Sequence, residues 1–103
     1  MAVVDSYGKY LFVVNVTSND ISVFEVNAKT GTIRRVRGSP FSTARQPVAA
    51  ALDWSDSFLY VVSGSSRNIS QFAVEDDRGL HSIGNPVPAG LGPANIAARR
   101  GSK

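Results

Sequence analysis

The chain has 103 residues, of which 43% are hydrophobic and 18% charged, a composition that fits one modest globular domain and excludes a disordered segment. Cysteine is absent, which excludes a disulfide framework, a thiol nucleophile and a cysteine–metal site. The net charge is +3, and its excess lies between Arg34 and Arg45, which indicates either an anionic ligand or a solvated outer strand.

The predicted elements are short strands joined by polar turns. Segment 47–53 contains three consecutive alanines, which favour a helix, but its place between a proline and a turn predicts a strand instead. Two longer loops, 38–47 and 84–93, contain all five prolines. Turns are predicted at 5–8, 27–31, 53–56 and 76–79, where Asp, Asn and Gly are common. In chain order, we predict strands at 2–4, 9–16, 21–26, 32–36, 47–53, 58–64, 68–75, 80–83 and 94–98.

A hairpin of two apolar strands and a polar loop occurs twice in the chain. Ser57–Val74 repeats Lys9–Val26 at an offset of 48 residues. A repeat of this length that is built from short strands is typical of propeller blades or a similar array. The matched pairs include Leu11 with Leu59, Val13 with Val61, Ile21 with Ile69 and Phe24 with Phe72.

Each repeat is expected to form one four-stranded antiparallel sheet with an up-and-down order. Side chains are small in the inner strand, apolar in the middle strand and polar in the outer strand, a gradient typical of a propeller blade. We therefore predict an all-β fold with blade 1 at about 1–46, blade 2 at 47–93 and an extra inner strand at 94–98. Because middle strands are covered on both faces, we expect Val13, Val61, Phe24 and Phe72 to be core residues.

Several segments carry a family resemblance. Together they resemble the lactonase-type seven-bladed β-propeller family, which includes bacterial 6-phosphogluconolactonase. The resemblance implies about seven blades, of which this chain holds about two, and catalytic residues contributed by several blades around a channel. None of those residues can be assigned here. The segments are Asp5–Val13, Ile21–Phe24, Thr30–Ile33, Gly38–Pro40 and Gly92–Ala97, with Phe58–Val61, Ile69–Ser70 and Phe72 in the second copy.

Alternating strand directions place the loops of each blade on two opposite faces. One face receives the second-to-third strand loops and the outer-to-inner connections, and it is the richer in groups that could bind a ligand. These groups could equally serve only to cap their loops. The candidate ligand-binding residues are Asn15, Thr17, Arg45, Gln46, Ser63, Arg67 and Asn95.

The sequence gives little support for a catalytic triad, a metal site, or a nucleic-acid or membrane partner. His81 is the only histidine and falls on a polar outer strand, which argues against a Ser–His–Asp arrangement and against a histidine metal site. We therefore expect no metal and no cofactor. The aromatic residues fall at blade-core positions and are not interleaved with arginines, so we expect no nucleic-acid partner. No apolar run reaches the ~18 residues needed to cross a bilayer, and no signal peptide is recognisable, so we expect no membrane partner and a cytoplasmic location.

Two functions remain open. The favoured one is a lactonase-like propeller module that acts as an assembly and ligand-binding scaffold without catalytic machinery of its own. The alternative is a subunit of an assembled 6-phosphogluconolactonase-like sugar-lactone hydrolase, an enzyme of carbohydrate metabolism. Catalysis would require acid, base and anion-binding groups that converge at the axis. In either case the expected small ligand is an anionic sugar.

Two blades would leave two broad apolar faces without a partner, which is typical of an interface. We therefore expect a homo-oligomer in which blades close head to tail into a ring. Two blades per chain require an even total, so three copies would give six blades and four copies eight, and we favour the trimer. The extra strand at 94–98 could complete the short inner strand of the next copy.

Overall fold

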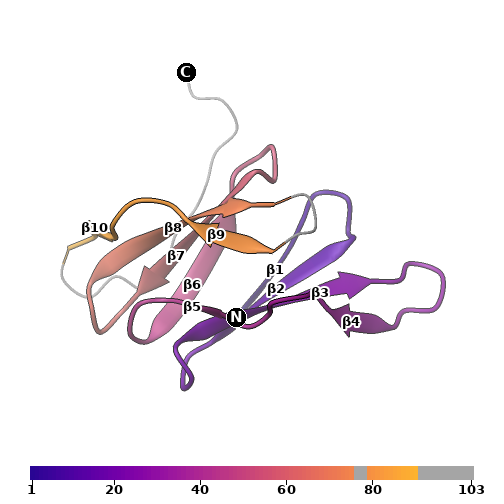
Figure 1. Ribbon diagram of the computed structural model, residues 1–103, viewed down its shortest axis with the longest axis horizontal. Helices are drawn as coiled ribbons and strands as arrows, with labels where there is room; N and C mark the ends of the chain where they lie inside the picture. The colour runs from indigo at the N-terminus through magenta and orange to yellow at the C-terminus, as the bar shows by residue number, and fades with distance from the viewer. Residues whose placement is uncertain (76–78, 91–103) are drawn as a thin grey trace.

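The computed structural model describes residues 1–75 and 79–90, which form two antiparallel sheets (Figure 1). The described residues contain no helix, and so none that could cross a membrane. Blade 1 has the strand order β1-β2-β3-β4, and β5 also pairs with β3. Its strands are β1 (Ala2–Val4), β2 (Tyr10–Asn15), β3 (Asp20–Val26), β4 (Ile33–Arg35) and β5 (Phe41–Ser42).

Blade 2 repeats this arrangement, which confirms the predicted all-β blades. Its sheet order is β10-β8-β7-β6, and β9 also pairs with β8. The alanine-rich segment is strand β6, so its neighbours in the sheet override the helix propensity of alanine. The strands are β6 (Pro47–Leu52), β7 (Phe58–Ser63), β8 (Asn68–Val74), β9 (Leu80–Ser82) and β10 (Val87–Pro88). The predicted strand at 94–98 lies outside the described residues.

The outer edge of each sheet differs from the prediction. We expected one outer strand per blade and a loop after it, but β5 and β10 add a second short strand in each loop. In blade 1, β4 pairs with one end of β3 and β5 with the other. Gly38 permits the change of direction between them with a φ of +88°, and a side chain there would lie 3.3 Å from the Phe41 ring. Because β4 and β5 share the outer edge of β3, the predicted order of four strand positions holds, and only the outer strand is divided in two.

Each sheet has two faces, because successive side chains of a strand point to opposite sides. The register between β2 and β3, and between β7 and β8, shows which side chains share a face. The front face carries Leu11, Val13 and Phe24 in blade 1, and Leu59, Val61 and Phe72 in blade 2. The back face carries Phe12, Val14, Ile21 and Val23 in blade 1, and Tyr60, Val62, Ile69 and Gln71 in blade 2.

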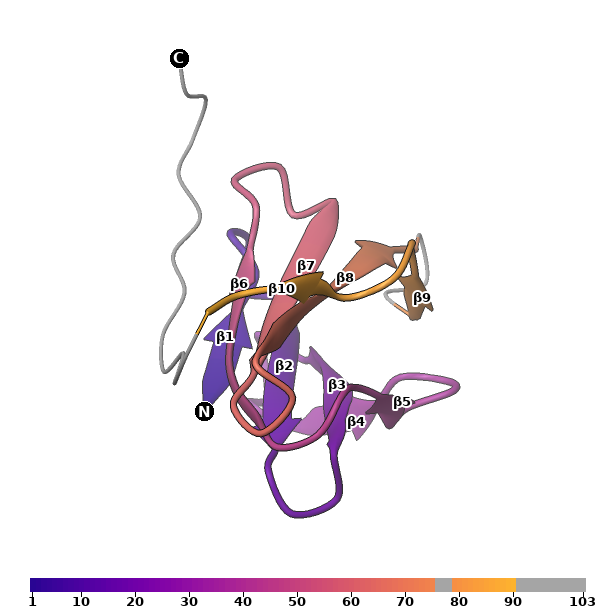
Figure 2. The ribbon, with the colours of Figure 1, turned by 90° about the vertical axis from the view of Figure 1, so that its left-hand side faces the viewer.

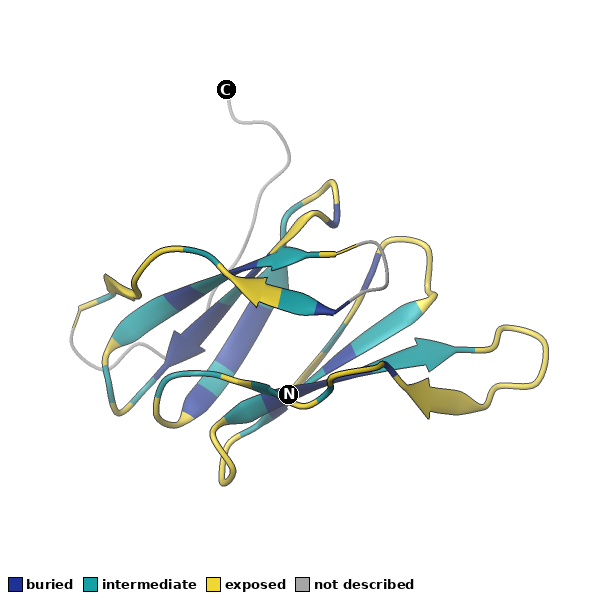
Figure 3. Ribbon diagram, viewed as in Figure 1, coloured by how far each residue is buried: buried dark blue, intermediate teal, exposed yellow. Residues whose placement is uncertain are grey.

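The core lies between the back face of blade 1 and the front face of blade 2 (Figure 3). Ile21 and Val23 of blade 1 and Leu59 of blade 2 are completely buried there. Val61 and Phe72 are buried as predicted, at 0% and 4% exposure. Their counterparts Val13 and Phe24 are only half-buried, so the core prediction was wrong for blade 1. The front face of blade 1 has no second sheet against it in the described residues.

A hydrogen-bonded latch joins the two blades at the end opposite the β2–β3 and β7–β8 loops. The Asp56 carboxylate accepts a hydrogen bond from the backbone N–H of Ser6 at 3.2 Å and another from the Ser6 hydroxyl. Asp56 belongs to blade 2, whereas Ser6 belongs to blade 1. In the repeat, Gly8 of blade 1 occupies the position of Asp56. Blade 1 therefore has no carboxylate with which to repeat this contact.

Candidate functional site

Three connecting segments meet at one end of the molecule, which we call the loop end (Figure 2). They are the β2–β3 loop at 16–19, the β5–β6 connection at 43–46 and the β7–β8 loop at 64–67. The turns at 5–8 and 53–57 lie at the opposite end (Figure 2). The structure therefore brings together the loops of both blades and the segment that joins them, as the alternating strand directions predicted.

Hydrogen bonds from the backbone fix the three segments of the loop end to one another. The backbone N–H of Gln46 donates to Asn19 Oδ1 at 2.8 Å, and the Gln46 carbonyl accepts from the backbone N–H of Gly64 at 2.9 Å. The backbone N–H of Arg45 donates to Ser66 Oγ at 2.9 Å. These hydrogen bonds run from blade 1 through the connection to blade 2, so they hold the three segments together as one surface.

Two arginine side chains from different segments stand on this surface. Arg45 belongs to the β5–β6 connection and Arg67 to the β7–β8 loop, and both are exposed. Among residues 1–75 and 79–90, the only ion pair joins Arg34 and Glu25, so neither Arg45 nor Arg67 has a carboxylate partner there. An exposed guanidinium group without a carboxylate partner can bind an anion through its N–H donors.

The other predicted ligand-binding residues lie in varied surroundings. Asn15 is held within blade 1, where its Nδ2 donates to Asp20 Oδ1 and to Ser22 Oγ, each at 2.8 Å. Thr17 is exposed on the β2–β3 loop. Ser63 is completely buried, so it lies below the surface that the arginines share. Asn95 lies outside the described residues.

Three of the four non-glycine residues with positive φ in the described part of the chain lie at the loop end. Asn19, Gln46 and Arg67 all have positive φ, at 58°, 53° and 56°. Asn adopts this region readily, but Gln and Arg do so at a conformational cost that the surrounding contacts must offset. Such residues are enriched at binding sites, where the backbone is held in one geometry. Asp56 at the opposite end has a φ of 60° as well, and Arg67 repeats the turn position of Asn19, so these angles describe tight turns at both ends of the molecule.

Two residues that fix the geometry of the loop end were not predicted from the sequence. Ser66 and Asn19 hold the connection in place through their side-chain oxygens, yet neither was a predicted site residue. Ser66 is matched by Ser18 in the repeat, but Ser18 donates to Asp20 Oδ1 within its own hairpin. The repeat therefore predicted a polar loop residue at both positions, but it did not predict that Ser66 joins two segments and Ser18 does not.

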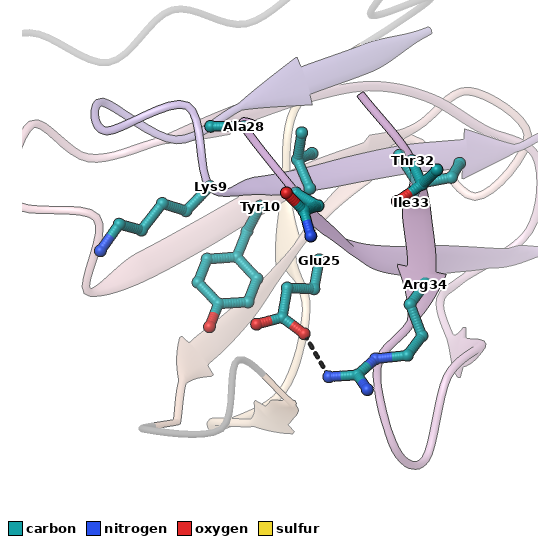
Figure 4. A pocket seen from close by; sticks show the side chains of 9 residues that line it. Lys9, Tyr10, Glu25, Ala28, Thr32, Ile33 and Arg34 are labelled. Atoms are coloured by element: carbon teal, nitrogen blue, oxygen red, sulfur yellow. Dashed lines mark hydrogen bonds and ion pairs between the residues drawn. The ribbon is translucent and has the colours of Figure 1, made fainter. Parts of the chain in front are cut away.

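A second surface with positive charge is the outer cleft of blade 1, shown in Figure 4. Its volume is about 590 Å³. Arg34 Nη2 lies 2.6 Å from Glu25 Oε1 on its wall, but both side chains are exposed, so the pair contributes little stability. A neighbouring hollow of about 370 Å³ shares three of its residues and adds Arg35 and Arg37. The cleft is lined by Lys9, Tyr10, Glu25, Val26, Asn27, Ala28, Thr32, Ile33 and Arg34.

Apart from Arg45, Arg67 and Asp20, the titratable side chains of the described residues lie away from the loop end. His81 is exposed on β9, as predicted. No group of three or more potential metal ligands occurs within the part of the chain that the structure describes. Partial burial raises the pKa of the Asp53 carboxyl, but hydrogen bonds from Ser55, Phe58 and Ser57 outweigh it and hold that pKa below its ordinary value. Asp53 lies in the turn at the opposite end, where its carboxylate accepts hydrogen bonds from the backbone of that turn.

Comparisons with known proteins agree with this architecture. The periplasmic gluconolactonase of Pseudomonas aeruginosa is 21% identical with a TM-score of 0.81, over 89% of this chain and 26% of that one. For a candidate 6-phosphogluconolactonase of Bacteroides fragilis the identity is 21% and the TM-score 0.82, over 92% and 26% of the two chains. Hydrazine synthase of Kuenenia stuttgartiensis also matches, with 21% identity and a TM-score of 0.71, over 91% of this chain and 24% of that one.

These structural likenesses show the fold alone, since one fold serves proteins of different function. The chain spans about a quarter of the length of these proteins. No curated protein sequence matches it. A family model described as lactonase, 7-bladed beta-propeller, matches residues 2–93, which is almost the whole chain. The chain therefore belongs to the lactonase family of seven-bladed β-propellers.

Proposed function

We propose that this chain is a two-blade propeller module that works by assembly and by binding a small anionic ligand, without catalytic machinery of its own. The observation that carries the proposal is the loop end, where Arg45 and Arg67 are exposed on a surface that backbone hydrogen bonds hold together. Neither arginine has an ion-pair partner among the described residues.

The chemistry of the loop end favours a phosphorylated or carboxylated sugar. A guanidinium group binds phosphate or carboxylate oxygens through two parallel hydrogen bonds, and two such groups from different segments can hold one anion. Thr17 and Ser65 are exposed on the same end, where hydroxyl groups can bind the hydroxyls of a sugar. Gln46 is also exposed, and its side chain already accepts a hydrogen bond from Ser65.

Thermal unfolding tests this proposal directly. A ligand that binds only the folded protein raises its melting temperature, and the rise grows with ligand concentration. We expect 6-phosphogluconate and sulfate to raise the melting temperature, and the Arg45→Ala, Arg67→Ala double variant to lose that rise. The matched control is Arg35→Ala with Arg37→Ala, which removes two exposed arginines next to the outer cleft. If the control loses the rise and the loop-end variant keeps it, the ligand binds in the outer cleft and the proposal is wrong.

A second candidate function is a subunit of a sugar-lactone hydrolase. It is supported by the family match and by the names of two similar structures, a gluconolactonase and a candidate 6-phosphogluconolactonase. Hydrolysis of 6-phosphogluconolactone, measured against its spontaneous rate, separates the two functions. A rate that rises with protein concentration and falls in the Arg45→Ala, Arg67→Ala variant would favour the hydrolase. The scaffold function predicts no acceleration.

The compartment and the absence of nucleic-acid and membrane partners stay predictions from the sequence. We propose a cytoplasmic location, although the Pseudomonas aeruginosa relative is described as periplasmic. Fractionation of cells that express the chain would decide between the two compartments.

A further inference from the structure

The front face of blade 1 is an apolar surface that no second sheet covers in the described residues. Val4 and Ile33 are 54% and 53% exposed, and the side chains between them are half-buried. Monomeric proteins rarely leave so many neighbouring apolar side chains in contact with water. This free face consists of Val4, Leu11, Val13, Phe24, Val26 and Ile33.

Blade 2 shows what such a face packs against. Its front face carries six residues in the same strand positions, and every one belongs to the core or packs on it. Three of the matched pairs, at Leu11, Val13 and Phe24, combine identical residues of which only the blade 2 member is buried. The six counterparts, in the same order, are Leu52, Leu59, Val61, Phe72, Val74 and Leu80.

We propose that the free face of blade 1 is the docking surface for a second copy of this chain, which presents the back face of its blade 2. This inference rests on the assembly role proposed above and specifies the partner. The free face repeats a front face that this molecule already buries, so its partner must resemble the back face of blade 1. That back face carries Phe12, Val14, Ile21 and Val23.

The back face of blade 2 has the required chemistry. At the four positions it carries Tyr60 for Phe, Val62 for Val, Ile69 for Ile and Gln71 for Val. Tyr60, Ile69 and Gln71 are half-buried and can lose further surface to a partner, whereas Val62 is already only 1% exposed. The second copy therefore docks chiefly through Tyr60 and Ile69, and a head-to-tail contact of this kind can repeat until a ring closes.

The latch between the two blades of one chain also has an equivalent at the proposed contact between two copies. Within the chain, Ser6 of blade 1 binds Asp56 of blade 2. At the proposed contact between two copies, blade 2 of one copy presents Trp54 at the position equivalent to Ser6. Blade 1 of the other copy presents Gly8 at the position equivalent to Asp56. Trp54 is 56% exposed, and a Cβ added at Gly8 would meet no other atom within 4 Å. At the contact between copies, the indole of Trp54 packs against Gly8 in place of the hydrogen bonds between Ser6 and Asp56.

Solution mass and the fluorescence of Trp54 test the docking together, because Trp54 is the only tryptophan. For the full 103-residue chain at micromolar concentration, we expect a mass of three or four times 11.0 kDa by sedimentation. Dilution should return the monomer and move the Trp54 emission to longer wavelength as the indole regains water. A stable monomer at micromolar concentration, or an oligomer whose Trp54 emission does not respond to dilution, would overturn the proposal.

A matched pair of variants locates the interface. Val13→Asp places a carboxylate on the free face and should lower the association constant by at least about tenfold, since a buried unpaired charge is strongly unfavourable. Val16→Asp makes the same change at a position that is 43% exposed beyond the end of β2, and should leave the mass unchanged. Circular dichroism confirms that both variants fold. Equal loss of association in the two variants would place the contact elsewhere.

The two proposals fail separately. A monomer whose melting temperature still rises with 6-phosphogluconate in an arginine-dependent manner would refute the docking surface and leave the ligand-binding function intact. An oligomer that disperses in Val13→Asp but shows no rise would refute the loop-end ligand and support the docking surface.

Discussion

The front faces of the two blades carry nearly the same residues in nearly the same positions, yet one is core and the other is not. Leu59 and Val61 are completely buried, while Leu11 and Val13 are half-buried. The difference lies in the neighbour, because the back face of blade 1 covers only the front face of blade 2. Residue type thus determines which face a blade can bury, and the adjacent sheet determines whether it does.

The largest effect that separates the two faces should come from the matched phenylalanines. Phe72→Ala removes a ring that is 4% exposed, and should lower the free energy of unfolding by about 3–5 kcal/mol. Phe24→Ala should cost less, because hydrophobic stabilisation scales with the area removed from water and Phe24 is less buried than Phe72. Urea unfolding of the dilute monomer, followed by circular dichroism, measures both.

Concentration sharpens this test. If a second copy covers the front face of blade 1, the cost of Phe24→Ala should rise toward that of Phe72→Ala under conditions where the oligomer forms. Equal costs in the dilute monomer would contradict the observed difference in burial. A cost for Phe24→Ala that stays small in an oligomer would place the contact on another surface.

The next effect concerns the latch, which only one of the two blades possesses. Asp56→Gly gives blade 2 the residue that blade 1 has at Gly8, and should lower the free energy of unfolding by about 1.5–3 kcal/mol through loss of hydrogen bonds to a charged group. The φ of Asp56 is +60°, which glycine adopts readily, so backbone strain cannot explain a loss.

Ser6→Ala provides the control for the latch. It removes the hydroxyl donor but keeps the backbone N–H donor, so it should cost less than Asp56→Gly. A double-mutant cycle of the two should show a coupling energy, since both changes act on one contact. Strictly additive costs would mean that Asp56 stabilises its own turn rather than the junction between the blades.

Much of the fold could be predicted from the sequence, because the repeat carries independent information. The matched hairpins at Lys9–Val26 and Ser57–Val74 placed strands β2, β3, β7 and β8, and Pro47 with the following turn identified β6 as a strand. Strands β5 and β10 were missed because each has only two residues and lies in a loop that contains prolines. Their pairing depends on β3 and β8, which local propensity does not describe.

The candidate site was less predictable. Alternating strand directions placed the segments that carry Arg45 and Arg67 at the same end, and the hydrogen bond from Arg45 to Ser66 joins those segments in the structure. The contacts that fix that end, from Gln46 to Asn19 and from Arg45 to Ser66, join residues 27 and 21 positions apart in the chain. Neither a motif nor the repeat encodes such a pairing, because the equivalent Ser18 binds Asp20 within its own hairpin.

The smallest effect should distinguish the two turns that precede the middle strands. Asp5 Oδ1 accepts from the backbone N–H groups of Lys9 and Tyr10, and Asp53 Oδ1 accepts from those of Ser57 and Phe58. Asp53 has an additional donor, the Ser55 hydroxyl at 2.6 Å from Oδ2. In the repeat, Tyr7 stands in place of Ser55 and cannot make the same short contact.

This difference predicts a pH dependence. Burial alone would raise the pKa of Asp53, but the hydrogen bonds to its carboxylate hold the pKa below the ordinary value of 3.8. A carboxylate with a lowered pKa stabilises the fold fully above the unfolded-state value, and this contribution disappears as the pH falls through the folded-state value. Ser55→Ala should therefore make the free energy of unfolding fall less between pH 6 and pH 3, and Asp53→Asn should reduce the fall further. Urea titrations at the two pH values measure this, and an unchanged fall in Asp53→Asn would mean that other groups account for the acid sensitivity.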